Sequence, residues 1–154
     1  MPQTVDSVPK SCFKIEIATA SPCTSWTEIS GSSNSITGTT QTKMVGDEYT
    51  ADGNYAISEV GKYQPFDITV RMVFTHTAGE AYRRVRDRFL AGACTGRMCL
   101  RWIPGGAVGN AGFETNYAPI VSFDWPEVNA GEAGPIMANF VLHVASIDPF
   151  TYVS

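Results

Sequence analysis

The spacing of apolar residues predicts a chain built mainly of β-strands. In several stretches apolar and polar side chains alternate, which is typical of a strand with one face packed on a core. These stretches are residues 12–18, 26–29, 67–75, 97–103 and 118–125. A longer stretch, residues 136–147, carries apolar side chains on both faces, and we therefore expect it near the centre of a sheet.

Residues 77–92 form the only stretch with clear helical spacing. Its apolar side chains recur at helical spacing and make one stripe: Ala78, Ala81, Tyr82, Val85 and Phe89. Thr77 and Glu80 have the spacing of a capping box, in which each side chain accepts a hydrogen bond from the other residue's backbone amide. Gly92 is placed to end the helix, because glycine readily adopts positive φ. A helix this short is marginal alone, so we expect its stripe to pack on the sheet.

Residues 36–57 predict a long, largely polar β-hairpin. Asp52 and Gly53 form a strong tight-turn signal, while Asp47 and Glu48 give the expected tip an acidic character. A two-stranded hairpin is marginally stable at best in water. We therefore expect the hairpin to be either floppy or completed by another subunit.

The remaining segments are expected to be irregular. Residues 1–11 contain two prolines and predict an extended arm, and residues 61–65 predict a turn. Residues 107–117 predict a loop rich in glycine and asparagine. Pro149 is expected to close the last strand and leave a short tail.

The length and charge of the chain narrow its class. The 154 residues fit one domain (1–154) with no internal repeat, and no apolar run is long enough to span a bilayer. The net charge of −4 argues against general binding to nucleic acid or anionic membranes. Removing the helix's four arginines and two acids from the totals of 11 and 15 leaves seven bases against 13 acids, so the β-part is the more acidic.

No motif predicts catalysis, a metal site or a cofactor. Cys94, Cys99, His76 and His143 lack the tight paired spacing of zinc ligands. The sequence contains no nucleophile elbow, phosphate-binding loop or dinucleotide-binding turn. Because no N-terminal apolar run indicates export, we expect the four cysteines to be reduced thiols, largely buried.

The helix arginines have two interpretations. Arg83 and Arg84 lie opposite the apolar stripe, where they could pair with Asp87 and Glu80 respectively at a spacing of four residues. The simpler interpretation is a solvated face of paired charges. The alternative is a subunit contact, in which the arginines bind acids of a neighbouring copy.

The order of these pieces resembles a known family. A strand and WTEI are followed by a polar hairpin with DEYTADG. The strand DITVRMVFT then runs into T-x-G-E-A-Y-x-x-V-x-x-x-F, and RMCLRWIPGG precedes a Gly-rich loop. PIVSFDWPEVNAGEAGP and an apolar terminal strand complete the pattern. Over residues 13–149 this order is similar to the tail tube (major tail) proteins of long, non-contractile-tailed bacteriophages.

The resemblance implies a structural virion protein rather than an enzyme. Subunits of that family form hexameric rings that stack into a hollow tail tube, through which DNA reaches the host without specific binding. It implies assembly in the host cytoplasm with tail-tip, tail-terminator and tape-measure proteins. It also implies assembly roles for the hairpin at residues 36–57 and for the arm at residues 1–11. The candidate assembly residues are Met44, Asp47, Glu48, Tyr49, Asp52, Arg83 and Arg84.

Two other functions remain open at this point. The inner tube of a contractile injection device would share the fold and the rings. A soluble β-sandwich that binds carbohydrate would instead use Trp26, Trp102 and Trp125 as stacking surfaces. Trp26 is expected to anchor the core, and Trp102 and Trp125 share strand faces with apolar residues. The pattern therefore favours packing of all three in the core.

Overall fold

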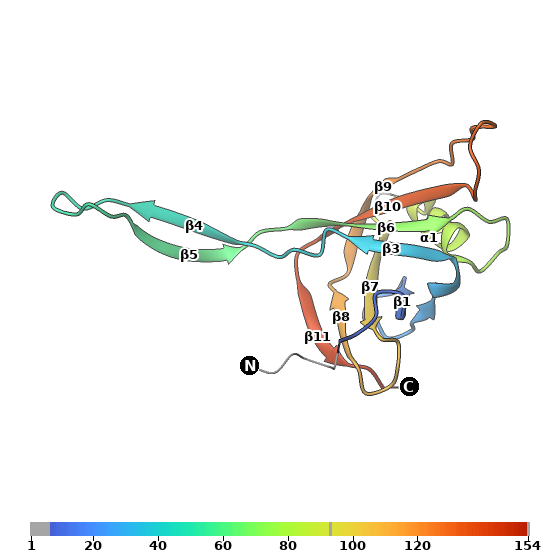
Figure 1. Ribbon diagram of the computed structural model, residues 1–154, viewed down its shortest axis with the longest axis horizontal. Coiled ribbons are helices and arrows are strands. Elements are labelled where there is room, and N and C mark those ends of the chain that lie inside the picture. The colour runs from blue at the N-terminus through green and yellow to red at the C-terminus, as the bar shows by residue number, and fades with distance from the viewer. Residues whose placement is uncertain (1–6, 93, 154) are drawn as a thin grey trace.

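The computed structural model describes residues 7–153 except residue 93, and it confirms a mainly β architecture with one α-helix in that part of the chain. Figure 1 shows a β-rich body from which one long hairpin projects. No helix in the described residues is long and apolar enough to cross a membrane. In chain order the elements are β1 (Phe13–Ala18), β2 (Thr27–Glu28), η1 (Ser30–Ser32), β3 (Ser33–Thr37), β4 (Lys43–Glu48), β5 (Ile57–Tyr63), β6 (Phe66–Val73), α1 (Ala81–Leu90), β7 (Arg97–Pro104), β8 (Ala111–Thr115), β9 (Ala118–Phe123), β10 (Met137–Val144) and β11 (Ile147–Thr151).

The body is one nine-stranded antiparallel sheet that curls around its core. Its main path runs β11-β8-β7-β9-β10-β6-β3, and β1 pairs with β7 on one side and β2 on the other. The two halves of this path meet at a short ladder between β7 and β9, where Arg97 faces Pro119 and Met98 faces Ala118. In Figure 1 the strands β3, β6 and β10 run across the view, whereas β7, β8 and β11 run up and down it.

The core lies between the two halves of the curled sheet. Strand β10 pairs with both β6 and β9, so the predicted central position of residues 136–147 is confirmed. Alternate residues of the predicted strands are fully buried, as for Ile68, Val70 and Met72 in β6. Burying one large aliphatic or aromatic side chain contributes about 1.5–3 kcal/mol.

The helix packs its predicted stripe onto this core. Ala81, Tyr82 and Val85 are buried, and the Tyr82 ring lies 4.7 Å from Phe74 and 5.3 Å from Phe123 between centroids. Gly92 has φ +116°, as expected for the residue that follows the helix.

The predicted capping box is wrong. The helix begins at Ala81 rather than near Thr77, and its N-cap residue Glu80 makes no side-chain cap hydrogen bond. The amide of Ala81 instead donates a hydrogen bond of 3.0 Å to Ser32 Oγ. Ser32 lies 49 residues earlier in the chain. Ser32 is buried, so tertiary packing supplies the cap that local sequence was expected to supply.

Two strands lie where irregular structure was expected. Strand β8 occupies part of the predicted loop, and β11 occupies the predicted tail and pairs with β8. Pro149 is tolerated because β11 forms an edge of the sheet, where a missing amide costs no ladder hydrogen bond. Gly112 leaves room in β8 for the Phe150 ring, since a Cβ there would lie 2.5 Å from that ring.

The hairpin lies later in the chain than predicted. Its strands are β4 and β5, whereas Ile36 belongs to β3 and faces Val70 of β6. Asp47 and Glu48 lie in β4 rather than in a turn, and the turn expected at residues 61–65 is shortened because β5 continues to Tyr63. Of the predicted arm, residues 1–6 lie outside the described residues, and residues 7–11 are exposed and form no strand or helix.

The prediction of four reduced, buried cysteines is also wrong. Cys23 and Cys99 form a disulfide with Cα atoms 6.3 Å apart, whereas Cys12 and Cys94 are free and exposed. The disulfide ties the connection between β1 and β2 to strand β7, across 76 positions of sequence.

Breaking this disulfide is expected to destabilise the protein. For 76 residues, the chain-entropy argument gives about 4 kcal/mol of lost unfolding free energy. We expect that loss in urea unfolding of a chain carrying Cys23→Ala and Cys99→Ala. The control carries Cys12→Ser and Cys94→Ser and should keep the wild-type midpoint. Equal midpoints for the two variants would contradict the prediction.

Candidate functional site

The hairpin is the most exposed apolar feature of the molecule. Seven large apolar side chains between Lys43 and Tyr63 are 55–88% exposed: Met44, Val45, Tyr49, Tyr55, Ile57, Val60 and Tyr63. The hairpin is therefore less polar than the sequence reading indicated. Exposed apolar groups gathered in this way mark interaction surfaces.

The two faces of the hairpin differ in chemistry. On one face Val45 lies opposite Val60, and Lys43 lies opposite Tyr63, with its Nζ 4.9 Å from the ring centroid. We call this the valine face, and Asp47 and Ser58 complete it. The glutamate face carries Glu48 opposite Ile57, Glu59 opposite Gly46, and Met44.

The structure places the candidate assembly residues in two separate regions. Met44, Asp47, Glu48, Tyr49 and Asp52 lie on the exposed hairpin. Arg83 and Arg84 lie on α1, which packs on the body while the hairpin points away from it (Figure 1). The two groups are therefore not brought together within one molecule.

The helix arginines do not form the predicted pairs. Arg83 Nη1 donates to the carbonyl of His76 at 3.4 Å, and Arg84 Nε donates to the carbonyl of Gly79. Glu80 has an extended backbone at the N-cap, so its side chain is not one helical turn from Arg84. Asp87 pairs with Arg86 instead of Arg83, at 2.7 Å.

A cavity that the sequence reading missed lies beside these arginines. It has a volume of about 350 Å³ and is formed between α1 and the chain around β2. Its polar lining consists of Thr19, Ser25, Thr27, Arg84, Asp87 and Arg88. We call it the arginine cavity. No local motif predicts it, because its lining combines residues of α1 with residues 17–27, which lie far away in the sequence.

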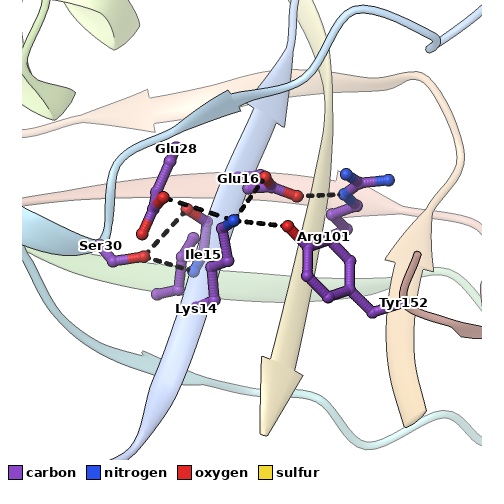
Figure 2. Close-up of polar contacts among 7 residues, drawn as sticks. All are labelled: Lys14, Ile15, Glu16, Glu28, Ser30, Arg101 and Tyr152. Atoms are coloured by element: carbon purple, nitrogen blue, oxygen red, sulfur yellow. Dashed lines mark hydrogen bonds and ion pairs between the residues drawn. The ribbon is translucent and has the colours of Figure 1, made fainter. Parts of the chain in front are cut away.

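A second cluster of charges ties the first strand to the end of the chain (Figure 2). Glu16, with a side chain only 7% exposed, accepts a hydrogen bond from Arg101 Nε and lies 3.5 Å from Lys14 Nζ. Lys14 donates to Tyr152 Oη at 2.6 Å and pairs with Glu28 at 3.4 Å. The hydrogen bond to Tyr152 raises the pKa of Lys14; burial opposes the rise, and Glu16 and Glu28 add to it.

Aromatic rings enclose the arginine of this cluster. The Arg101 guanidinium lies 4.3 Å from the Trp26 ring centroid and 5.4 Å from that of Phe150. Each buried charge thus has an opposite charge beside it, as burial requires. The cluster binds β1, β2, β7 and the last strand together, so its geometry indicates a structural role.

The tryptophans do not all lie in the core. Trp26 is half-buried under Arg101, and Trp102 is half-buried against the core. Trp125 is 56% exposed, which contradicts the prediction that it packs inside. It lies two residues beyond Phe123, the last residue of β9, where the alternation no longer determines which face a side chain takes.

The residues considered for a metal site do not form one. His143 lies 2.7 Å from Asp67, and His76 is exposed beside Phe74. Cys99 is held in the disulfide. Within the described part of the chain, no three His, Cys, Asp or Glu side chains lie close enough to hold a metal ion.

Removing Arg101 is expected to destabilise the fold. Arg101→Ala leaves Glu16 buried with a weaker partner and should cost about 3 kcal/mol of unfolding free energy in urea. Arg101→Lys should cost less, because it keeps the charge but loses the planar stacking. The control is Arg97→Ala, which changes an exposed side chain of the same strand and should stay within about 0.5 kcal/mol of wild type. An equal loss for Arg101→Ala and Arg97→Ala would count against the role assigned to the cluster.

Comparison with known proteins identifies the fold. No protein-family model and no curated protein sequence matches the chain. The tube terminating cap of the anti-feeding prophage superposes with a TM-score of 0.78 at 11% identity, covering 99% of this chain and 96% of that chain. A chain of the PVC sheath–tube complex, from an extracellular contractile injection system, gives 0.76 at 14% identity over 96% and 94%. A chain of the SPP1 tail tube gives 0.61 at 11% identity over 96% and 81%. The chain therefore has the fold found in tail tubes and in the tubes of contractile injection systems.

Proposed function

We propose that this protein is a structural subunit whose copies assemble into a hollow tube. The observation that carries the proposal is the exposed hairpin, because a chain with this fold presents seven large apolar side chains that its own core does not cover. A contact with another copy would bury them. The same proposal assigns the protein no enzymatic activity and no cofactor.

Similar structures support a sixfold symmetry for the proposed tube. The baseplate of the anti-feeding prophage is described as 6-fold symmetrised, and the tail of the empty GTA particle has C6 symmetry. Chains in these structures superpose on this one with TM-scores of 0.72 and 0.65. We therefore propose hexameric rings, which stack head to tail into a tube.

The sequence resemblance indicated a non-contractile tail, whereas the proposal covers contractile tails as well. The similar structures include sheath–tube complexes of a contractile injection system as well as the SPP1 tail tube. The proposal is therefore a tube subunit of either kind, placed in the tail of a virion or of a phage-like particle. Its expected partners are its own copies, a terminator or cap protein, and tail-tip or baseplate proteins, with a tape-measure protein to set the length.

A second candidate function is supported by one observation. Trp125 is exposed beside a cavity whose lining includes Arg71, Asp124, Glu127 and Asn139. A tryptophan face with such polar groups is a surface on which a sugar ring could stack and form hydrogen bonds. A melting temperature that rises with added oligosaccharide, in a protein that stays monomeric, would favour this function over the tube.

Electron microscopy of the purified protein tests the tube directly. We expect rings or tubes from wild-type protein, and folded monomers from Val45→Glu with Val60→Glu, because two carboxylates on the valine face cannot be buried against a neighbour. Lys62→Glu is the matched control: it changes the net charge by the same −2 but keeps both valines, and it should still assemble. Wild-type protein that stays monomeric under all salt conditions would contradict the proposal.

If the tube carries a genome, its wall should not bind DNA. DNA is densely anionic, and the acids outside the helix outnumber the bases by 13 to seven, so like charge lowers friction during transit. We expect assembled tubes to show no measurable DNA affinity at low salt, by sedimentation with a labelled duplex. Tight binding that weakens steeply as salt is added would contradict this part of the proposal.

A further inference from the structure

The arginine cavity has a lining that suits acidic groups. Arg84 and Arg88 lie one helical turn apart and line the same cavity, together with the hydroxyls of Thr19 and Ser25. In the described part of the chain, no carboxylate forms an ion pair with either arginine. The acid in the lining, Asp87, is paired with Arg86. The lining therefore offers two guanidinium groups and hydrogen-bond donors to an incoming anion.

The two arginines are held in place by the fold. Arg88 Nε donates to the carbonyl of Arg97 at 2.7 Å, and Arg88 Nη2 donates to Tyr117 Oη. Arg84 is bonded through Nε to the carbonyl of Gly79, which leaves its two terminal nitrogens to face solvent or a ligand. A guanidinium fixed in this way binds carboxylates with little further loss of side-chain entropy.

The glutamate face of the hairpin offers a matching pair of acids. Glu48 and Glu59 lie diagonally across β4 and β5 on the same face, and both are exposed. Neither has an ion-pair partner within the described residues. Carboxylates on diagonal neighbours are separated by roughly the spacing of side chains four apart on a helix.

Apolar groups accompany the charges on both surfaces. Ile57 lies next to Glu48 and Glu59 on the glutamate face and is 55% exposed. Leu90 is 60% exposed at the end of α1, and Ala91 lines the cavity. Contact between these groups would remove water from around the ion pairs and so strengthen them.

We propose that the glutamate face of one subunit's hairpin docks into the arginine cavity of a neighbouring copy, with Glu48 and Glu59 binding Arg84 and Arg88. The occupant is a second copy because the hairpin points away from its own α1 (Figure 1), and because charge and apolar groups are complementary on the two surfaces. The contact is head-to-tail, since the two surfaces differ, and such contacts generate rings and filaments. This inference rests on the proposed tube, and it specifies which surfaces join the subunits.

Charge reversal tests the contact. We expect Arg84→Glu, Glu48→Arg and Glu59→Arg, each made alone, to reduce the yield of tubes in pelleting assays by at least roughly tenfold. Arg84→Glu is then combined with Glu48→Arg in one chain and with Glu59→Arg in another. One of these two double variants should recover to within about threefold of wild type, because the ion pair at position 84 re-forms with reversed sign while Arg88 keeps its own glutamate. Circular dichroism of each variant checks that the monomer is folded. Failure of both double variants to recover, from folded monomers, would overturn the contact.

A matched control and a direct probe accompany this test. Asp47 lies beside Glu48 in sequence but on the valine face, so Asp47→Arg should fail to rescue Arg84→Glu; rescue by it would overturn the assignment of faces. In a chain with Cys12→Ser and Cys94→Ser, Ile57→Cys and Ala91→Cys keep all four charged residues of the contact. This variant should form dimers and higher multimers on non-reducing gels after mild oxidation of tubes. Tubes that assemble without cross-links would overturn this contact and leave the tube intact, whereas wild-type protein that never assembles would overturn the proposed function itself.

Discussion

The ladder between β7 and β9 is the constraint on which the body depends. It contains two facing residue pairs, yet it is the place where the two halves of the sheet join. Because the ladder is short, the halves can run in different directions and close over one core, as Figure 1 shows. The helix then covers that core through Tyr82 and Val85. Strands β4 and β5 form a separate two-stranded sheet and take no part in this core.

The parts of the fold that the sequence predicts are those where one strand's own pattern is sufficient. The alternation in β6 places Ile68, Val70 and Met72 inside, because a shift of one residue would turn these apolar side chains toward solvent. The same reasoning cannot find β8 or β11. Their residues are paired because Gly112 leaves room for Phe150, and that fit is visible only when both strands are in place.

The candidate site is predicted only in part, for a related reason. The hairpin acids and the helix arginines are visible in the sequence as separate charged groups. The cap of α1 comes from Ser32, and the arginine cavity is lined by Thr19 and Ser25 as well as by α1, so both depend on residues far away in the chain. The pair expected between Glu80 and Arg84 assumed that the helix begins at Thr77, and it fails because the helix begins after Glu80. The pair expected between Arg83 and Asp87 fails because Asp87 binds Arg86 instead.

The disulfide between Cys23 and Cys99 has a mechanical consequence. The segment that it closes contains both the hairpin and α1, which are the two surfaces proposed to join neighbouring copies. A load that enters a subunit through the hairpin and leaves through the helix therefore stays within one covalent ring. The strands outside that ring, among them β8 and β11, do not have to carry it. Tension along such a tube would pass from subunit to subunit through closed loops of chain rather than through the edge of the sheet.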